Sequence, residues 1–187
     1  MRKLALLLMV LAASPASPQL YINETALFRS IYSAQLQCPV QVSWTLHRQD
    51  VGQSLREPSW RFTHDLPDFI MSAQHSDYTH SGYDRGHMCP AADFSCSTYY
   101  MRQTFVMSNI CPQVPSVNRG SWKTTENYCR NAALVFDSVS VLAVPVFIDR
   151  DTAYIGTHRL AVPHAFFKAV WVTATDSVLN SWFIFNK

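Results

Sequence analysis

The densest cluster of chemically useful side chains is the tetrapeptide Asp84-Arg85-Gly86-His87. The imidazole of His87 has an ordinary pKa near neutrality, so it can take a proton from water. Arg85 places a permanent positive charge two residues away, and Gly86 lets the backbone turn sharply between them. Most histidines in loops serve packing or the surface, and the chain has seven histidines, so this cluster alone indicates a catalytic base only weakly.

Further candidate residues follow downstream. Asn109 comes near the end of an expected strand, and Asn118 opens an expected helix on which Glu126 and Arg130 lie one turn apart. Positions four residues apart on a helix drift by only about 40° per step, so Glu126 and Arg130 point to the side that Asn118 overlooks. These side chains could line one cleft. By themselves, Glu126 and Arg130 would form an ordinary helix pair worth a few tenths of a kcal/mol.

The residue types in this group suit a magnesium site. An amide oxygen at a helix start, with a carboxylate nearby, is a suitable ligand for a Mg²⁺ ion that keeps most of its waters. Asn118 and Glu126 form such a set. Cleavage of a phosphodiester needs such an ion, a general base and positive charges around the phosphate. His87, Arg85 and Arg130 could supply the base and the charges.

The elements that must position these residues are expected in the order α, β, loop, β, α, β, β, β. Before the second helix we expect a helix at 23–37, a strand at 40–46, a long irregular stretch at about 50–82 and a strand at 104–110 that Cys111-Pro112 ends. The second helix begins between Asn118 and Ser121, with an apolar face of Trp122, Cys129, Ala133 and Phe136. β-Branched and aromatic strands follow at 138–148, 160–172 and 181–185. The sequence therefore predicts an α+β fold with a mixed or antiparallel central sheet.

The composition supports one folded domain. The 187 residues are 48% hydrophobic and 13% aromatic, which is too apolar for a disordered tail. No internal repeat or linker divides residues 17–187, so we expect a single domain there.

The first sixteen residues are typical of a secretory signal peptide. Met1-Arg2-Lys3 precedes an uncharged run at 4–13, and Ser14-Pro15-Ala16 supplies small residues for cleavage near Ala16. A membrane anchor is the alternative, but the run is about half as long as the roughly 20 residues that a spanning helix needs. We therefore expect an exported protein, secreted or periplasmic, that does not span a membrane.

The net charge excludes strong bulk attraction to nucleic acid. Residues 1–16 hold two of the 15 basic residues and none of the 13 acidic ones, so the mature chain carries 13 of each. Binding of a polyanion must then depend on a local patch. Residues 82–130, with five basic and three acidic side chains, are the stretch that leans positive.

Several motifs together resemble the DNA/RNA non-specific endonucleases, the family of the Serratia-type secreted nucleases and mitochondrial endonuclease G. In chain order they are Tyr83 to Met88, Phe105 to Gln113, Asn118 to Trp122, and Glu126 with Arg130. The resemblance covers about residues 40–186, including the Val-Pro-His-Ala-Phe-Phe-Lys segment at 162–168. It implies a ββα-metal active-site motif and an endonuclease that hydrolyses both DNA and RNA.

The resemblance also implies a role for each polar motif residue. His87 would be the general base that activates water, and Asn109 would orient the histidine and the metal site. Asn118 would bind Mg²⁺ directly, with Mn²⁺ or another divalent cation as an alternative, and Glu126 would hold metal-bound water.

Arginines complete the implied site. Arg85 and Arg130 would neutralise the phosphate, and metal-bound water would protonate the leaving 3′ oxygen to give 5′-phosphate ends. An arginine that the family has upstream of the base matches either Arg56 or Arg61 here, and the sequence does not decide between them. One departure is Thr125, where the family usually has an apolar residue, and it bears on helix packing more than on chemistry.

The chain has five cysteines and no C-x-x-C pair. Export favours disulfides over five reduced thiols, and an odd count leaves at least one thiol unpaired. Cys89 and Cys111 each lie two residues after a proposed site residue, His87 and Asn109. If those two converge, a Cys89–Cys111 disulfide is expected across the active-site core, with Cys129 as the rival partner.

The combined interpretation is an exported, magnesium-dependent, sugar-non-specific endonuclease. DNA and RNA would be its substrates, while an inhibitor protein as partner and the oligomeric state are left open. One alternative is a catalytically inactive relative that binds nucleic acid, but every motif position is filled. A second alternative is a disulfide-stapled secreted binding module without catalysis.

Overall fold

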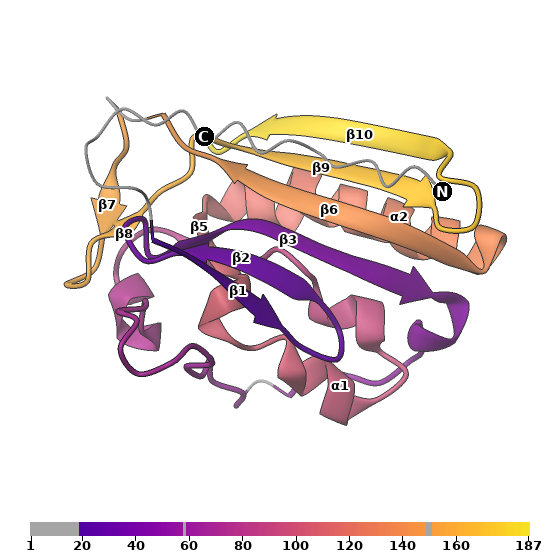
Figure 1. The fold of residues 1–187 in the computed structure, drawn as a ribbon, viewed down its shortest axis with the longest axis horizontal. Helices are drawn as coiled ribbons and strands as arrows, with labels where there is room; N and C mark the ends of the chain where they lie inside the picture. The colour runs from indigo at the N-terminus through magenta and orange to yellow at the C-terminus, as the bar shows by residue number, and fades with distance from the viewer. Residues whose placement is uncertain (1–18, 58, 149–150) are drawn as a thin grey trace.

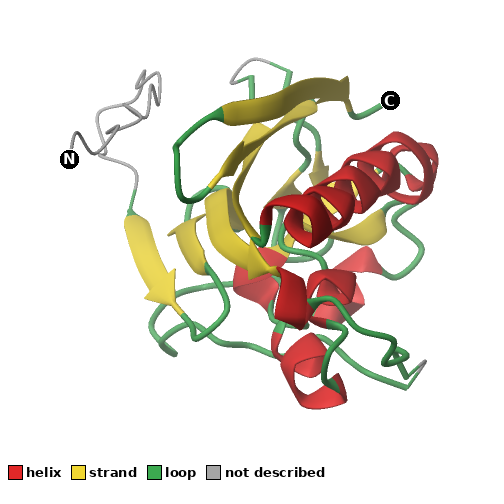
Figure 2. Ribbon diagram, turned by 90° about the vertical axis from the view of Figure 1, so that its right-hand side faces the viewer, coloured by secondary structure: helices red, strands yellow, loops and turns green. Residues whose placement is uncertain are grey.

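The computed structural model describes residues 19–57, 59–148 and 151–187. Its centre is a six-stranded antiparallel sheet with the strand order β1-β2-β3-β6-β9-β10 (Figure 1). The helices gather on one side of this sheet, as Figure 2 shows. The fold is α+β, as expected. The expected signal peptide at 1–16 lies outside the described residues.

The strands of the central sheet are β1 (Leu20–Glu24), β2 (Arg29–Ser33), β3 (Cys38–His47), β6 (Ser138–Val146), β9 (Ala165–Val172) and β10 (Val178–Phe185). Two small antiparallel sheets are formed by β4 (Asp84–His87) with β5 (Ile110–Gln113) and by the hairpin of β7 (Tyr154–Ile155) with β8 (Leu160–Ala161). The α-helices are α1 (Thr98–Gln103) and α2 (Lys123–Phe136), and a π-helical turn at Val117–Trp122 leads directly into α2. Short 3₁₀ turns lie at Arg48–Asp50, His75–Tyr78, Ala91–Phe94 and Met107–Asn109. No helix among these described segments is long and apolar enough to cross a membrane.

The main core lies between the central sheet and α2. Alternate residues of β3, including Val42, Trp44 and Leu46, are buried, which confirms the strand expected at 40–46. They pack with the buried face of α2, where Cys129 and Ala133 lie. This packing fixes α2 relative to the sheet, and hydrophobic burial of this kind is the main stabilising contribution in a domain of this size.

The prediction of a helix at 23–37 is wrong, because most of this segment lies in the β1–β2 hairpin. Its turn is built by Thr25, whose backbone N–H donates to Phe28 O and whose Oγ1 accepts from the N–H groups of Leu27 and Phe28. A side chain that bonds its own backbone in this way competes with a helix. β2 then pairs with β3, and the Tyr32 side chain, which packs with Leu66 and Ile70, is completely buried.

The strand expected at 104–110 is displaced towards the C-terminus. Residues 107–109 form a 3₁₀ turn, and β5 runs through Pro112, which was expected to end the strand. Proline lacks an N–H group and is tolerated in a strand that has a free edge. β5 pairs with β4 alone, so its other edge needs no donor at Pro112.

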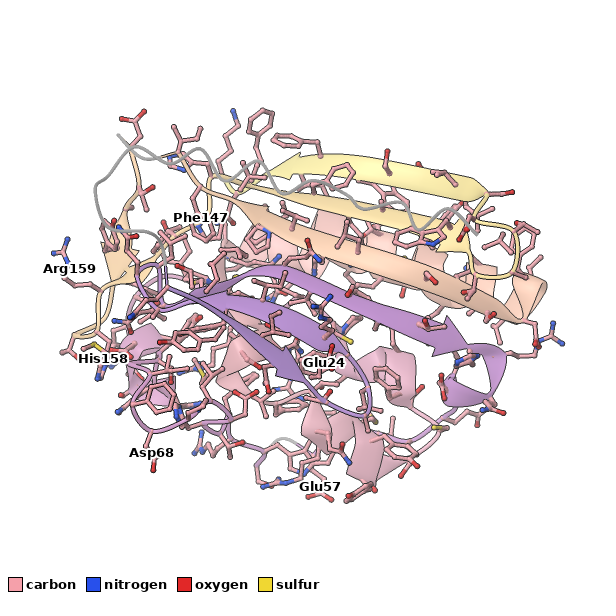
Figure 3. All side chains as sticks on the ribbon, in the orientation of Figure 1. Glu24, Glu57, Asp68, Phe147, His158 and Arg159 are labelled. Carbon is pink, nitrogen blue, oxygen red and sulfur yellow. The ribbon has the colours of Figure 1, made fainter. Side chains whose placement is uncertain are left out.

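The long irregular stretch expected at about 50–82 is confirmed: its described residues form the 3₁₀ turn His75–Tyr78, the end of the turn Arg48–Asp50 and an isolated bridge between Thr63 and Val106, with no longer element. Side chains tie it to distant segments: Asp65 accepts from the backbone N–H and the hydroxyl of Ser108, and Asp77 pairs with His158 beside the β7–β8 hairpin at 2.9 Å. His158 and Asp68, both labelled at the lower left of Figure 3, line the same cavity. The loop is therefore anchored against the rest of the domain.

The expected Cys89–Cys111 disulfide is wrong, since all five cysteines are free thiols in the structure. The thiol of Cys111 lies 3.8 Å from Pro39 O and has Cys38 as its thiol neighbour. Cys89 has the carboxylate of Asp93 among its neighbours instead. The thiols of Cys89 and Cys111 thus have different neighbours. Convergence of His87 and Asn109 therefore does not bring the two cysteines together.

Gly86 lies where β4 packs against the fully buried side chain of Gln113. A Cβ atom at position 86 would overlap Gln113 Oε1, which has no solvent to move into. We expect Gly86→Ala to lower the free energy of unfolding by about 1–3 kcal/mol, as overpacking does. Denaturant unfolding measures this. Gly120→Ala is the matched control, because a Cβ atom there meets nothing within 4 Å, and equal losses at both sites would contradict the prediction.

Candidate active site

His87 ends β4, and its ring is enclosed by two aromatic side chains. The ring centroids of Phe62 and Phe105 lie 5.2 and 4.8 Å from that of His87. The backbone carbonyl of His87 accepts a hydrogen bond of 3.0 Å from Trp122 Nε1. Burial, with a smaller effect of the Arg56 charge, lowers the pKa of His87 to about 3. The imidazole is therefore neutral near neutral pH, which is the form that accepts a proton.

Arg56 and Arg61 both lie near this region, beside different residues. The guanidinium of Arg56 lies 4.6 Å from the ring centroid of Phe105, which also contacts His87. Arg61 instead adds positive charge near Arg85, where it helps burial to lower the pKa of that guanidinium. The sequence left these two arginines as alternatives, and the structure places Arg56 as the one beside the histidine.

Arg85 is held on the same strand as His87, two residues before it. Its Nη2 donates a 2.7 Å hydrogen bond to His75 O, and its guanidinium lies 5.3 Å from the ring centroid of Tyr78. Alternation along a strand puts residues 85 and 87 on one face. The guanidinium and the imidazole therefore face the same side of the β4–β5 sheet.

Asn118 lies in the π-helical turn before α2, and Asp84 fixes its amide. Asn118 Nδ2 donates to Asp84 Oδ2 at 2.9 Å, and Arg119 binds the same carboxylate through two hydrogen bonds of 2.8 and 2.7 Å. The hydrogen bond and charge of Arg119 keep the pKa of Asp84 below its usual value. Because the Asn118 NH₂ group is committed to Asp84, the amide oxygen points away from that carboxylate. Asp84 had no predicted role, although it belongs to the Asp84-Arg85-Gly86-His87 cluster.

The side chain of Asn109 is fully buried and binds backbone. Its Oδ1 accepts from Cys89 N at 2.9 Å, and its Nδ2 donates to Cys89 O at 2.8 Å and to Thr104 O at 3.0 Å. Met88 N also donates to Asn109 O at 2.9 Å. Asn109 thus fixes the backbone that follows His87. The resemblance implies that Asn109 orients the histidine and the metal site, and these bonds, which use both amide hydrogens, hold the backbone next to His87.

Arg130 has a different partner from the one that its helical spacing indicates. It donates to Asp93 Oδ1 at 2.8 Å, and Asp93, fully buried, also accepts from Trp44 Nε1 at 2.9 Å. Arg130 Nη2 donates to Asn127 Oδ1 at 2.5 Å. The simple pair with Glu126 is therefore replaced by an ion pair that joins α2 to the segment before α1. The N–H groups that remain on the guanidinium are those that a phosphate could use.

Glu126 is half-buried on α2 beside these charges. Burial raises the pKa of its carboxyl to about 7, and the positive charge of Lys168 opposes that rise. Glu126 is therefore divided between its protonated and ionised forms near neutral pH. This is the one candidate residue whose protonation changes in the physiological range.

The donor set fits a hydrated ion rather than a fully liganded one. Among the described residues, no group of three or more His, Cys, Asp and Glu side chains could hold a metal ion. The amide oxygen of Asn118 is nevertheless oriented by Asp84, and Mg²⁺ commonly keeps several waters and takes one or two protein oxygens. The residues present fit a divalent cation bound directly through Asn118.

The β4–β5 sheet carries His87, and the π-helical turn with α2 carries Asn118 and Glu126. Together they form a ββα-metal nuclease fold. The chain belongs to the DNA/RNA non-specific endonuclease family, whose model matches residues 12–186. This confirms the family resemblance seen in the sequence.

Named relatives and a solved structure agree with this assignment. The chain is 32% identical over 158 residues to "Nuclease 1, mitochondrial" of Schizosaccharomyces pombe, covering 76% of this chain and 48% of that protein. It is 37% identical over 117 residues to "Endonuclease G, mitochondrial" of Homo sapiens, covering 58% and 39%. A crystal structure of the EndoG/EndoGI complex matches with a TM-score of 0.79 at 26% identity, covering 89% of this chain and 74% of that one. The chain thus spans about half, or less, of the length of these curated relatives.

Proposed function

We propose that this protein is a magnesium-dependent endonuclease that hydrolyses phosphodiester bonds in both DNA and RNA. The observation that carries the proposal is a neutral, partly buried His87 at the end of β4, with Arg56 near it and Arg85 on the same face of that strand. Asn118, oriented by Asp84, stands at the start of the adjoining helix. The relatives' names, which include nucleases and endonuclease G, agree with this class of activity.

Each residue then has a defined task in hydrolysis. His87 takes a proton from the attacking water, for which its low pKa keeps it in the neutral form. Arg56 and Arg85 balance the negative charge that builds on the phosphate. Asn118 would hold Mg²⁺, which when bound adds positive charge at the phosphate and the leaving oxygen. Glu126 accepts hydrogen bonds from water beside Asn118, and the products would carry 5′-phosphates.

Export to the periplasm or the medium belongs to the same proposal. Its support is the basic start, apolar run and small residues of positions 1–16. N-terminal sequencing of protein recovered outside the cytoplasm should begin near residue 17, whereas a mature protein that keeps Met1 would contradict export. An inhibitor protein as a partner also remains a proposal, which the complex of the similar EndoG makes worth testing.

A degradation assay with plasmid DNA and single-stranded RNA tests the proposed activity most directly. Purified protein should degrade both in the presence of Mg²⁺ and neither with EDTA, and added Mg²⁺ should restore cleavage. Loss of neither substrate in any divalent cation would contradict the enzyme and favour an inactive nucleic-acid-binding relative.

The pH dependence of cleavage should follow Glu126 and not His87. With its pKa raised to about 7, Glu126 becomes protonated as the pH falls. The carboxyl then lacks the negative charge that strengthens the hydrogen bonds it accepts from water. His87, with a pKa of about 3, stays neutral over the same range. At low Mg²⁺, kcat/KM should therefore fall about tenfold per pH unit below pH 7. Glu126→Gln should lower kcat/KM and flatten this limb, and a limb that persists unchanged in that variant would contradict the assignment.

A further inference from the structure

Lys168 is a fully buried lysine in the middle of the central sheet. It lies on β9, and its Nζ makes no hydrogen bond to any residue that the structure describes. The ammonium lies 3.7 Å from the ring centroid of Trp122 and 6.0 Å from that of Trp44. Burying an ammonium without hydrogen bonds is strongly unfavourable unless other charges compensate it. Its position therefore needs a reason.

Two carboxylates and one guanidinium surround the same interior region. The positive charge of Lys168 acts on both Asp93 and Glu126, opposing the rise in pKa that burial causes in each carboxyl. Arg130 supplies the second positive charge through its ion pair with Asp93. With Lys168 present, two positive groups stand against two acidic groups. Without it, Arg130 would be the positive charge that both carboxyl groups share, with Lys123 acting on Glu126 as well, so the buried region would lose part of its charge balance.

Trp122 connects the ammonium to the proposed base. One face of its indole lies against Lys168 Nζ, while the indole N–H donates to the carbonyl oxygen of His87. The indole is fully buried and packs against Phe166 with 5.3 Å between ring centroids. A cation that lies over an indole is held to it by the charge distribution of the ring, and more strongly when water is excluded. The ammonium thus restrains the ring that in turn restrains His87.

We propose that Lys168 is a positioning residue of the active site, which fixes Trp122 and, through Trp122, the backbone of His87. Lys168 also balances the charges of Asp93 and Glu126 in the interior. This inference rests on the proposed nuclease function. It assigns Lys168 no contact with substrate. It also explains why a lysine occupies an otherwise apolar strand.

Lys168→Met tests the charge, because methionine keeps much of the shape and removes the ammonium. We expect kcat for plasmid cleavage to fall by about 10- to 100-fold, as a small misplacement near the reacting groups does, with KM within about twofold. The melting temperature should change little, because the variant loses the charge balance with Asp93 and Glu126 but also no longer has to bury an ammonium without hydrogen bonds. Val170→Ala is the matched control: Val170 is fully buried on the same strand face, so the variant should lose stability and keep kcat.

Trp122→Phe tests the connection, because it keeps a ring below the ammonium and removes the N–H that His87 accepts. This variant should show a comparable fall in kcat. The double variant should lose no more than the worse single variant, because groups that act in one chain are not additive. Wild-type kcat in Trp122→Phe, or fully additive losses, would overturn the proposal, even where Lys168→Met fails to fold.

A readout independent of cleavage separates this inference from the proposed function. Hydrogen exchange of the Trp122 indole N–H, followed by NMR, should be at least tenfold faster in Lys168→Met than in the wild type. Wild-type protein without nuclease activity would end the proposed function, while the exchange rates would still report the coupling. Unchanged indole exchange together with wild-type kcat in Lys168→Met would show that the ammonium positions nothing.

Discussion

His87→Ala is expected to lower kcat by about 10²- to 10⁴-fold, the contribution usual for a general base. The imidazole is kept neutral by burial and by the charge of Arg56, and Trp122 fixes its backbone carbonyl. His87 is the one histidine on β4, so in the variant no imidazole of this strand can take a proton from the attacking water. Single-turnover cleavage of plasmid at saturating Mg²⁺ measures the effect on the chemical step.

The controls for His87→Ala address its packing role. The ring lies between Phe62 and Phe105, so the variant also loses contacts, and we expect a stability loss of about 1–3 kcal/mol. A melting curve shows whether the variant is folded at the assay temperature. His47→Ala removes an exposed histidine at the end of β3 and should keep full activity. Cleavage by His87→Ala within tenfold of the wild-type rate would exclude this residue as the base.

Strand and helix patterns in the sequence predicted the parts of the fold that depend on one-sided burial. The alternation at 40–46 and the apolar face beginning at Trp122 correspond to β3 and α2, because each buries one side against the same core. The helix predicted at 23–37 is wrong, since the turn that the Thr25 side chain stabilises and the pairing of β2 with β3 outweigh a loose helical spacing. Such tertiary pairing is not encoded in a local period.

The motif residues were located by their order, but their partners were not. Arg130 pairs with Asp93, 37 residues away, where helical spacing suggested Glu126. Asn109 binds the backbone of Cys89, 20 residues away, a contact that depends on the pairing of β4 with β5. Lys168 was overlooked, although a single lysine inside an apolar strand is a signal that sequence alone can give. What the sequence lacks in each case is the distance between segments that are far apart in the chain.

Asn118→Ala is expected to raise the Mg²⁺ concentration needed for half-maximal cleavage by at least tenfold, because it removes the one direct protein ligand proposed for the ion. Asp84→Asn should act in the same direction, since the carboxylate holds the Asn118 amide in place, and partners of this kind are typically worth 10- to 100-fold in metal affinity. Titration of activity with Mg²⁺ at fixed ionic strength measures both variants.

The effect on Mg²⁺ has to be separated from an effect on α2 itself. Asn131→Ala is the matched control, because Asn131 is exposed on the same helix, and its Mg²⁺ titration should match the wild type. For Asn118→Ala, saturating Mg²⁺ should recover part of the lost rate, since His87, Arg56 and Arg85 are unchanged. An unchanged titration in Asn118→Ala would place the ion elsewhere, and a rate loss that no Mg²⁺ concentration relieves would assign Asn118 to substrate rather than to the metal.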